Sequence, residues 1–189
     1  GSWISGPAIS DGTLIRLIRT IADATRLTVT LAARNGIYAQ YIHVLETESG
    51  FPIHIPVGTC RLLVWSAAGL ALLRDDGPKA VRALVQRTNA EVPNVPPING
   101  DQVLRHVETF RRQGYFLSDS LVTPGGGHIS MGLPEAATDG RNIVIGAAGS
   151  SRTVMRDEAR IVAAMRQAIT AIYDESGEAV RTTGGGDGR

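Results

Sequence analysis

Cysteine, aromatic residues and long apolar runs are scarce in this sequence. Its 189 residues include one cysteine, Cys60, and aromatic residues make up 5%. One cysteine excludes a disulfide within the chain and fits a reducing compartment, so we expect a cytoplasmic protein. No apolar run reaches the roughly 18 residues of a membrane-spanning helix, and no signal peptide is evident. We therefore expect no membrane association.

Net charge is also small, because 19 Lys and Arg are balanced by 18 Asp and Glu. DNA-binding domains usually concentrate basic residues on one face, and this sequence shows no such concentration. With 43% hydrophobic residues, the chain is long enough for one domain with a sizeable core. We expect this domain at residues 11–175, after a linker or cloning remnant at 1–10 and before a disordered tail at 176–189.

The first third of the chain predicts a helix followed by a β-hairpin. Apolar residues recur at helical spacing from Ile9 to Arg26. In Leu27–Ala33 they alternate with threonines, which is typical of a strand, and Ile37–Leu45 is the returning strand. Asn35-Gly36 between them is the dipeptide best suited to a tight hairpin turn. The proline-containing stretch 46–59 is expected to be a loop.

Three helices are predicted in the middle of the chain. Leu62–Leu73 is apolar almost all round, so we expect a helix sandwiched between layers. Its small residues, Ser66–Gly69, would allow close approach of another backbone or of a ligand. Pro78–Thr88 and Asp101–Gln113 are amphipathic, and Gly114 ends the second of them.

The last third predicts strands and a closing helix. Residues 115–121 and 128–134 are expected to be short strands, Ile143–Gly149 a buried strand, and Arg156–Tyr173 a helix. The whole order of elements indicates an α+β domain, an antiparallel sheet with helices packed on it. The clustered helices in the middle argue against a doubly wound parallel sheet.

The glycine run in "TPGGGHISMGLP", residues 123–134, raises the question of catalysis. A phosphate-binding glycine loop needs a helix directly after it, whereas Gly125–Gly127 leads into an alternating, strand-like segment. A nucleophile elbow needs Gly-x-Ser-x-Gly, and Ser130 lacks the first of those glycines. The run is therefore expected to be a flexible lip, Thr123–Gly127, at the start of a strand.

Cysteine and histidine chemistry gives two further hypotheses. Cys60 precedes a predicted helix whose N-terminus would lower the thiol pKa, so one hypothesis is that the protein is a cysteine-dependent enzyme. The other is that Cys60 is a small, unreactive residue. The four histidines have no metal-ligand spacing, and a site built from His54, Cys60 and His128 has no local support. We expect no metal, no cofactor and no enzymatic activity, which leaves a binding domain.

Four strings in a fixed order carry a family resemblance. They are "PVGTCRLLVWSAAGLALL", "VETFRRQGYFLSD", "GHISMGLP" and "NIVIGAAGSS". From about Asp11 to Tyr173 the chain resembles the C-terminal effector-binding domain of IclR-family bacterial transcriptional regulators. The resemblance implies a GAF-like or profilin-like domain whose pocket binds a small metabolite, often a carboxylate. It also implies assembly as a dimer or tetramer, and DNA binding only through an N-terminal helix-turn-helix domain that this chain lacks.

Carried over from the family, the effector pocket has ten residues in this chain. They are Ile53, Arg61, Ala67, Ala68, Ser118, Asp119, His128, Ser130, Gly146 and Ala148. Gly146 and Ala148 stand where the family often has serines, and their lack of hydroxyls is expected to leave room for a larger, more apolar ligand. Arg61 replaces an apolar wall residue, and a guanidinium can hold a carboxylate with two hydrogen bonds.

We therefore predict an organic acid bulkier than a two- or three-carbon acid, with aromatic acids among the candidates. Arg61 would be its anchor, and His128 and Ser130 would make secondary polar contacts. The competing interpretations are an exposed, salt-bridged Arg61 and a solvated His128 at a strand edge. A pure oligomerisation domain with a vestigial pocket is the alternative for the domain as a whole.

Overall fold

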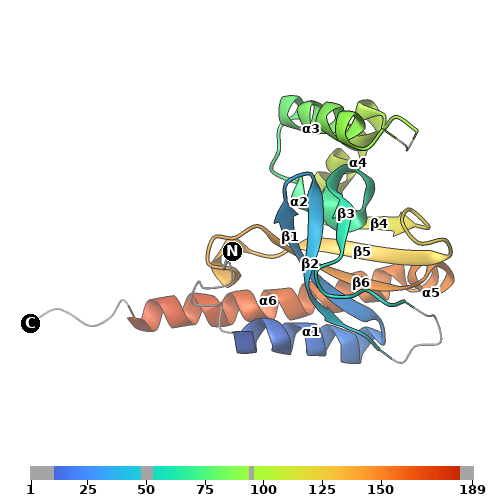
Figure 1. Ribbon diagram of the computed structural model, residues 1–189. Coiled ribbons are helices and arrows are strands. Elements are labelled where there is room, and N and C mark those ends of the chain that lie inside the picture. Colours follow the sequence, from blue (N-terminus) through green and yellow to red (C-terminus); the bar gives the residue numbers. More distant parts are fainter. Residues whose placement is uncertain (1–10, 48–52, 94–95, 184–189) are drawn as a thin grey trace, which may run out of the picture.

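The computed structural model describes residues 11–47, 53–93 and 96–183 (Figure 1). Helix α1 (Asp11–Thr25) leads into strands β1 (Thr28–Asn35) and β2 (Tyr38–Leu45). After a loop come strand β3 (Cys60–Leu62), a single-turn 3-10 helix η1 (Leu63–Trp65) and helices α2, α3 and α4 (Ala67–Leu72, Pro78–Glu91, Gly100–Gln113). The chain ends with strands β4, β5 and β6 (Phe116–Asp119, Gly126–Gly132, Ile143–Ser150) and helices α5 and α6 (Ser151–Arg156, Glu158–Thr183).

The strands form one six-stranded sheet in the order β3-β2-β1-β6-β5-β4, and every neighbouring pair is antiparallel. Helices α1 and α6 lie side by side on one face, and α2, α3 and α4 lie on the other (Figure 1). The predicted α+β class, an antiparallel sheet with helices packed on it, is confirmed. Within the described residues, no helix is long and apolar enough to cross a membrane.

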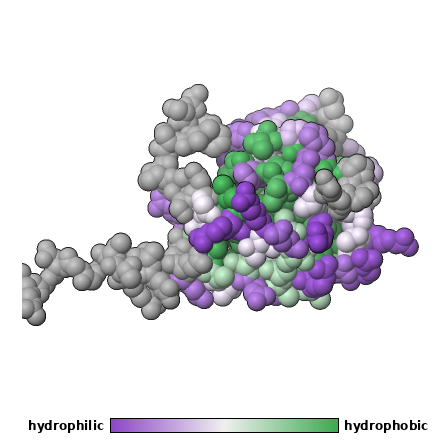
Figure 2. All heavy atoms as spheres, turned by 90° about the horizontal axis from the view of Figure 1, so that it is seen from below, coloured by the Kyte–Doolittle hydropathy of each residue, from purple (hydrophilic) through white to green (hydrophobic). Residues whose placement is uncertain are grey.

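Two apolar clusters fill the space on either side of the sheet. One joins α1 and α6 to the odd-numbered residues of the central strands, such as Leu31 and Ile145. The other joins α2, α3 and α4 to the opposite face, where Ala32 and Val144 lie. Seen from the side of α1 and α6, the surface is largely hydrophilic, with an apolar area gathered in its middle (Figure 2).

The predicted hairpin is confirmed, with its turn one residue later than expected. Asn35 pairs with Tyr38, so the two turn residues are Gly36 and Ile37. Gly36 has φ +60°. The first residue of this two-residue turn requires a positive φ, which glycine adopts without steric cost. Further along β2 one residue, Ile42, is extra, because Leu31 pairs with His43 and Ala32 with Tyr41.

The predicted single helix at Leu62–Leu73 is wrong. Residues 60–62 pair with β2 as an edge strand, Leu63–Trp65 form η1, and only Ala67–Leu72 is α-helical. Ser66 separates the two helical pieces and caps α2, because its Oγ accepts a hydrogen bond from the Gly69 amide at 3.0 Å. In a continuous apolar run, the periodicity of the sequence cannot distinguish a buried strand from a helix.

The predicted helices at 78–88 and 101–113 are confirmed as α3 and α4, and the strand predictions correspond to β4, β5 and β6. The predicted last helix, 156–173, corresponds to α6, and a short helix that was not predicted, α5, precedes it. Helix α6 continues to Thr183, so residues 176–183, assigned from the sequence to a disordered tail, are helical. Residues 1–10 and 184–189 lie outside the described residues, and the domain limits remain predictions.

Candidate functional site

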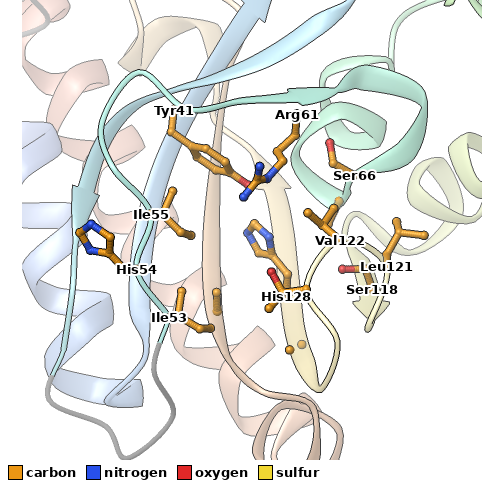
Figure 3. Close-up of a pocket in the computed structure, with 15 residues that line it drawn as sticks. Tyr41, Ile53, His54, Ile55, Arg61, Ser66, Ser118, Leu121, Val122 and His128 are labelled. Carbon is orange, nitrogen blue, oxygen red and sulfur yellow. The ribbon is translucent and has the colours of Figure 1, made fainter. Parts of the chain in front are cut away.

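A cavity of about 130 Å³ opens on the α2 side of the sheet. Its walls come from two separate parts of the chain. Residues 41–67 contribute β2, the loop before β3, β3 and the start of α2, and residues 118–148 contribute β4, the loop after it, β5 and β6 (Figure 3). The lining residues are Tyr41, Ile53, His54, Ile55, Arg61, Ser66, Ala67, Ser118, Leu121, Val122, Thr123, Gly126, Gly127, His128 and Ala148.

Six of the ten predicted site residues line this cavity. They are Ile53, Arg61, Ala67, Ser118, His128 and Ala148. The other four, Ala68, Asp119, Ser130 and Gly146, do not line it. Ala68 belongs to the apolar cluster beneath α2. Ser130 and Gly146 are opposite each other on β5 and β6, and Gly146 lies against the ring of His128.

Strand pairing explains how His128 reaches the cavity. His128 and Ser130 are two residues apart on β5, so their side chains lie on one face, the face opposite to that of Ile129. On β6, Ala148 pairs with His128 and Gly146 with Ser130. Around His128 this face is lined by the start of α2, the loop before β3 and the loop between β4 and β5 (Figure 3).

Arg61 provides the positive charge of the cavity. It lies in β3 opposite Ala39 of β2 and is partly buried. Within the described part of the chain, its guanidinium has neither an acidic partner nor a hydrogen bond, in contrast to Arg34, which pairs with Asp76 at 3.0 Å. The interpretation of Arg61 as an exposed, salt-bridged residue is therefore not supported. No Asp or Glu is among the lining residues, so the cavity suits an anion.

Tyr41 was not among the predicted site residues. It is 4% exposed, and its hydroxyl points toward the Arg61 guanidinium (Figure 3). Burial raises the pKa of Tyr41 to about 12, against a smaller opposite effect of Arg61, so the hydroxyl is protonated and can donate. The bulge at Ile42 decides on which face Tyr41 lies. The sequence carries no signal for that bulge.

His128 is a neutral, partly buried side chain. Burial lowers its pKa from 6.5 to about 4. Its Nε2 is buried, has no hydrogen-bond partner, and occupies the position that the Cβ of any larger residue at 146 would take. The space left by the missing side chain of Gly146 is therefore filled by the imidazole and is not free for a ligand, contrary to the prediction. The alternative of a solvated histidine at a strand edge is also wrong, because β5 lies between β4 and β6.

Asp119 stabilises a loop and does not face the cavity. Its Oδ1 accepts hydrogen bonds from the hydroxyls of Ser120 and of Ser151, the first residue of α5. The loop is further held by Ser120 N–H donating to Gly126 O at 2.8 Å and Gly126 N–H donating to Thr123 O at 2.9 Å. The predicted flexible lip at Thr123–Gly127 thus has a defined hydrogen-bonded geometry and contributes Thr123, Gly126 and Gly127 to the cavity wall.

Cys60 and the histidines do not form a reactive centre. Cys60 is exposed at the start of β3, outside the cavity lining, and a strand follows it, so the predicted activation by a helix N-terminus is wrong. His54 lines the cavity and pairs through Nδ1 with Glu46 at 2.7 Å. In the described ranges no group of three or more Cys, His, Asp or Glu could hold a metal ion.

Comparison with protein families and solved structures agrees with this arrangement. The family model "Bacterial transcriptional regulator IclR C-terminal" matches residues 13–174. Among solved structures, the effector domain of a transcriptional regulator IclR from Acinetobacter sp. ADP1 is 24% identical, with a TM-score of 0.79 over 87% of this chain and 95% of that one. Among curated proteins, none matches the chain.

Two longer structures are similar as well. An IclR-family regulator from Rhodococcus sp. is 24% identical, with a TM-score of 0.71 over 84% of this chain and 60% of that one. The IclR of Thermotoga maritima is 19% identical, with a TM-score of 0.74 over 89% of this chain and 68% of that one. At these identities the likeness shows a shared fold.

Proposed function

Because the chain belongs to the IclR family of bacterial transcriptional regulators, as their C-terminal effector-binding domain, we propose that its cavity binds a small organic acid. The predicted family, the predicted GAF-like fold and the expectation that the domain is not an enzyme are confirmed. In the proposal, the bound acid alters DNA binding by an N-terminal helix-turn-helix domain, in a cytoplasmic protein that self-associates as a dimer or tetramer.

The observation that carries the proposal is the guanidinium of Arg61, which has no ion-pair or hydrogen-bond partner among the described residues. A partly buried cation without a counter-ion is unfavourable, and a carboxylate would pair with it through two parallel hydrogen bonds. The Tyr41 hydroxyl points to the same place and can donate a third hydrogen bond (Figure 3). Ile53 and Ile55 on one side, with Leu121 and Val122 on the other, would contact the body of the acid.

The size of the cavity limits the acid. A cavity of about 150 Å³ holds one benzene molecule, and this cavity measures about 130 Å³. We therefore propose a compact acid, and an aromatic acid is a candidate only if part of it extends out of the open side of the cavity. A vestigial pocket in a pure oligomerisation domain would give no reason for an uncompensated charge at this position. The apolar area in Figure 2 supports self-association in either case.

The regulatory step would be a population shift. A ligand that binds one arrangement of the domain more tightly than another changes their ratio by its differential affinity. The loop 120–126 contacts both the cavity and the start of α5, since the Ser151 amide donates to Gly125 O at 2.8 Å. A ligand held between this loop and Arg61 would therefore favour one position of α5 relative to the sheet.

A thermal-shift screen of small carboxylic acids tests the proposal. An acid at 100 times its Kd stabilises the folded state by about 2.7 kcal/mol, which raises Tm by about 5–10 °C for a domain of this size. Arg61→Met should abolish the shift, whereas Arg105→Met, which removes an exposed charge on α4, should retain it. A panel of one-ring, oxygenated and aliphatic acids that leaves Tm unchanged would refute the proposal.

A further inference from the structure

One wall of the cavity is a segment without regular secondary structure, residues 53–55. All three of its residues line the cavity. The side chains of Ile53 and Ile55 point toward His128, whereas the ring of His54 points away from it (Figure 3). This alternation is that of an extended chain, and it places the two isoleucines against the body of a bound ligand.

A single carboxylate holds this segment. Within the described residues, the hydrogen bonds found for residues 53–55 both go to Glu46. Its Oε1 accepts one from the Ile55 amide at 3.2 Å and one from Nδ1 of His54 at 2.7 Å. Because an ionised carboxylate only accepts hydrogen bonds, Nδ1 carries a proton. Glu46 thus fixes both the backbone and a side chain of the segment.

The position of Glu46 is itself anchored. It directly follows the last residue of β2, and the hydroxyl of Thr47 donates to Arg26 O, between α1 and β1, at 3.0 Å. On the other side of the segment, the chain is held by β2, because Gly58 N–H donates to Tyr41 O at 2.7 Å. The segment therefore lies between two anchored points, and the side chain of Glu46 connects it to the sheet.

We propose that Glu46 is a positioning residue for this wall, which keeps Ile53 and Ile55 against the bound acid. Glu46 is not one of the lining residues, so it acts through the segment and not on the ligand. The effect on affinity rests on the proposed function, since it needs an acid in the cavity. A site whose binding-competent arrangement is only partly populated binds with a correspondingly higher Kd. An exposed ion pair contributes little to stability, so the loss of Glu46 affects binding far more than folding.

Amide hydrogen exchange in the ligand-free protein tests the wall directly. In Glu46→Ala the Ile55 amide should exchange about tenfold faster, because it loses its acceptor. Glu46→Gln keeps an acceptor in the same place and should stay within about threefold of the wild type.

Glu91→Ala is the matched control for this experiment. It removes the carboxylate of an ion pair on α3 whose N···O distance is also 2.7 Å, and the side chain of Glu91 is 47% exposed against 43% for Glu46. This variant should leave the exchange of the Ile55 amide unchanged. An Ile55 amide that exchanges equally fast in the wild type and in Glu46→Ala overturns the inference, whatever the cavity binds.

Calorimetric titration with propionate, butyrate and benzoate tests the effect on affinity. Glu46→Ala should raise Kd about three- to tenfold with a change in Tm of about 4 °C or less, and Glu91→Ala should leave Kd unchanged. Ile53→Ala should weaken binding less in the Glu46→Ala background than in the wild type, a coupling that a purely structural role of Glu46 would not produce.

The outcomes separate the inference from the proposed function. Equal Kd values for the wild type and Glu46→Ala overturn the inference and leave the proposed function standing. Additive effects of Ile53→Ala and Glu46→Ala on binding also overturn it. If none of the three acids binds to the wild type, the proposed function fails, and the effect of Glu46 on affinity fails with it.

Discussion

The imidazole of His128 occupies the volume that a side chain at residue 146 would need. The two residues belong to adjacent antiparallel strands, and the Nε2 of His128 lies at the Cβ position of any larger residue there. Thr30 Oγ1 lies 2.9 Å from the same position on the other side. A large residue at 128 and a glycine at 146 are thus matched by volume, and the shape of the cavity floor depends on the pair.

The first prediction follows from this match. Gly146→Ala should destabilise the domain by about 1–3 kcal/mol, because the added methyl group overpacks a filled space. In a His128→Ala background the same change should cost much less, so a double-mutant cycle should show a coupling energy of at least about 1 kcal/mol. Urea unfolding measures all four proteins. Gly77→Ala is the control, since no atom lies within 4 Å of the added Cβ. If the effects of the substitutions at 128 and 146 were additive, the imidazole of His128 could move aside without loss of stability.

The second prediction concerns pH. The pKa of His128 is lowered from 6.5 to about 4, so between these values an unfolded chain takes up a proton that the folded domain does not. The corresponding stability is fully present above pH 6.5 and is lost as pH falls toward 4. It amounts to at most about 3 kcal/mol.

A comparison with His128→Leu isolates this contribution. The stability difference between wild type and variant should change in favour of the variant as pH falls from 7 to 4. The pKa of His106 is also lowered, by burial and then by Arg105, but His106 is present in both proteins and cancels. A stability difference that is the same at every pH in this range would show that His128 does not titrate as a buried group. Denaturant unfolding at half-unit steps of pH measures it.

Much of this fold could be predicted because its elements have distinct periodicities. The hairpin, α3, α4 and the buried strand β6 follow directly from alternation or helical spacing. The stretch 62–73 could not be assigned correctly, because an apolar run is compatible with a strand and with a helix. What decides it is a tertiary contact, the pairing of Arg61 with Ala39 in β2.

The cavity residues also divide into those that the sequence could predict and those that it could not. Arg61 and His128 could be placed from motifs, because each lies within a string that the family resemblance covers. Tyr41 could not, since a bulge at Ile42 sets its direction. The hydrogen bonds that Asp119 accepts could not be predicted either, because the folded chain brings Ser151 to it from 32 residues away. Long-range hydrogen bonds leave no local pattern.

The third prediction distinguishes a loop-stabilising Asp119 from a ligand contact. Asp119→Ala removes the acceptor for the Ser120 and Ser151 hydroxyls, which should cost about 1 kcal/mol for exposed hydrogen bonds. Amide hydrogen exchange should accelerate across residues 120–126, with no change in α3, which lies far from the loop. Asp75→Ala, another exposed carboxylate for which no hydrogen bond or ion pair is found in the described residues, is the control. Unchanged exchange in the loop would show that its backbone hydrogen bonds suffice.

The last prediction concerns the contact that fixes the start of α2 beside the cavity. A Cβ at residue 69 would overlap the backbone of Leu63, including its carbonyl oxygen, and a backbone cannot move aside as a flexible side chain can. Gly69→Ala should therefore destabilise the domain by about 3 kcal/mol or more, since overpacking of a rigid contact exceeds the usual 1–3 kcal/mol.

Gly12→Ala provides the matched control, because Gly12 is also helical and no atom of the described residues lies within 4 Å of its added Cβ. Alanine is the better helix former by as much as about 1 kcal/mol, so this variant should be as stable as the wild type or more so. Since Ser66 and Ala67 line the cavity just before residue 69, Gly69→Ala should also weaken acid binding, whereas Gly12→Ala should not. A Gly69→Ala protein with wild-type Tm would mean that η1 and α2 can move apart without loss of stability. The cavity wall that they form would then not be rigid.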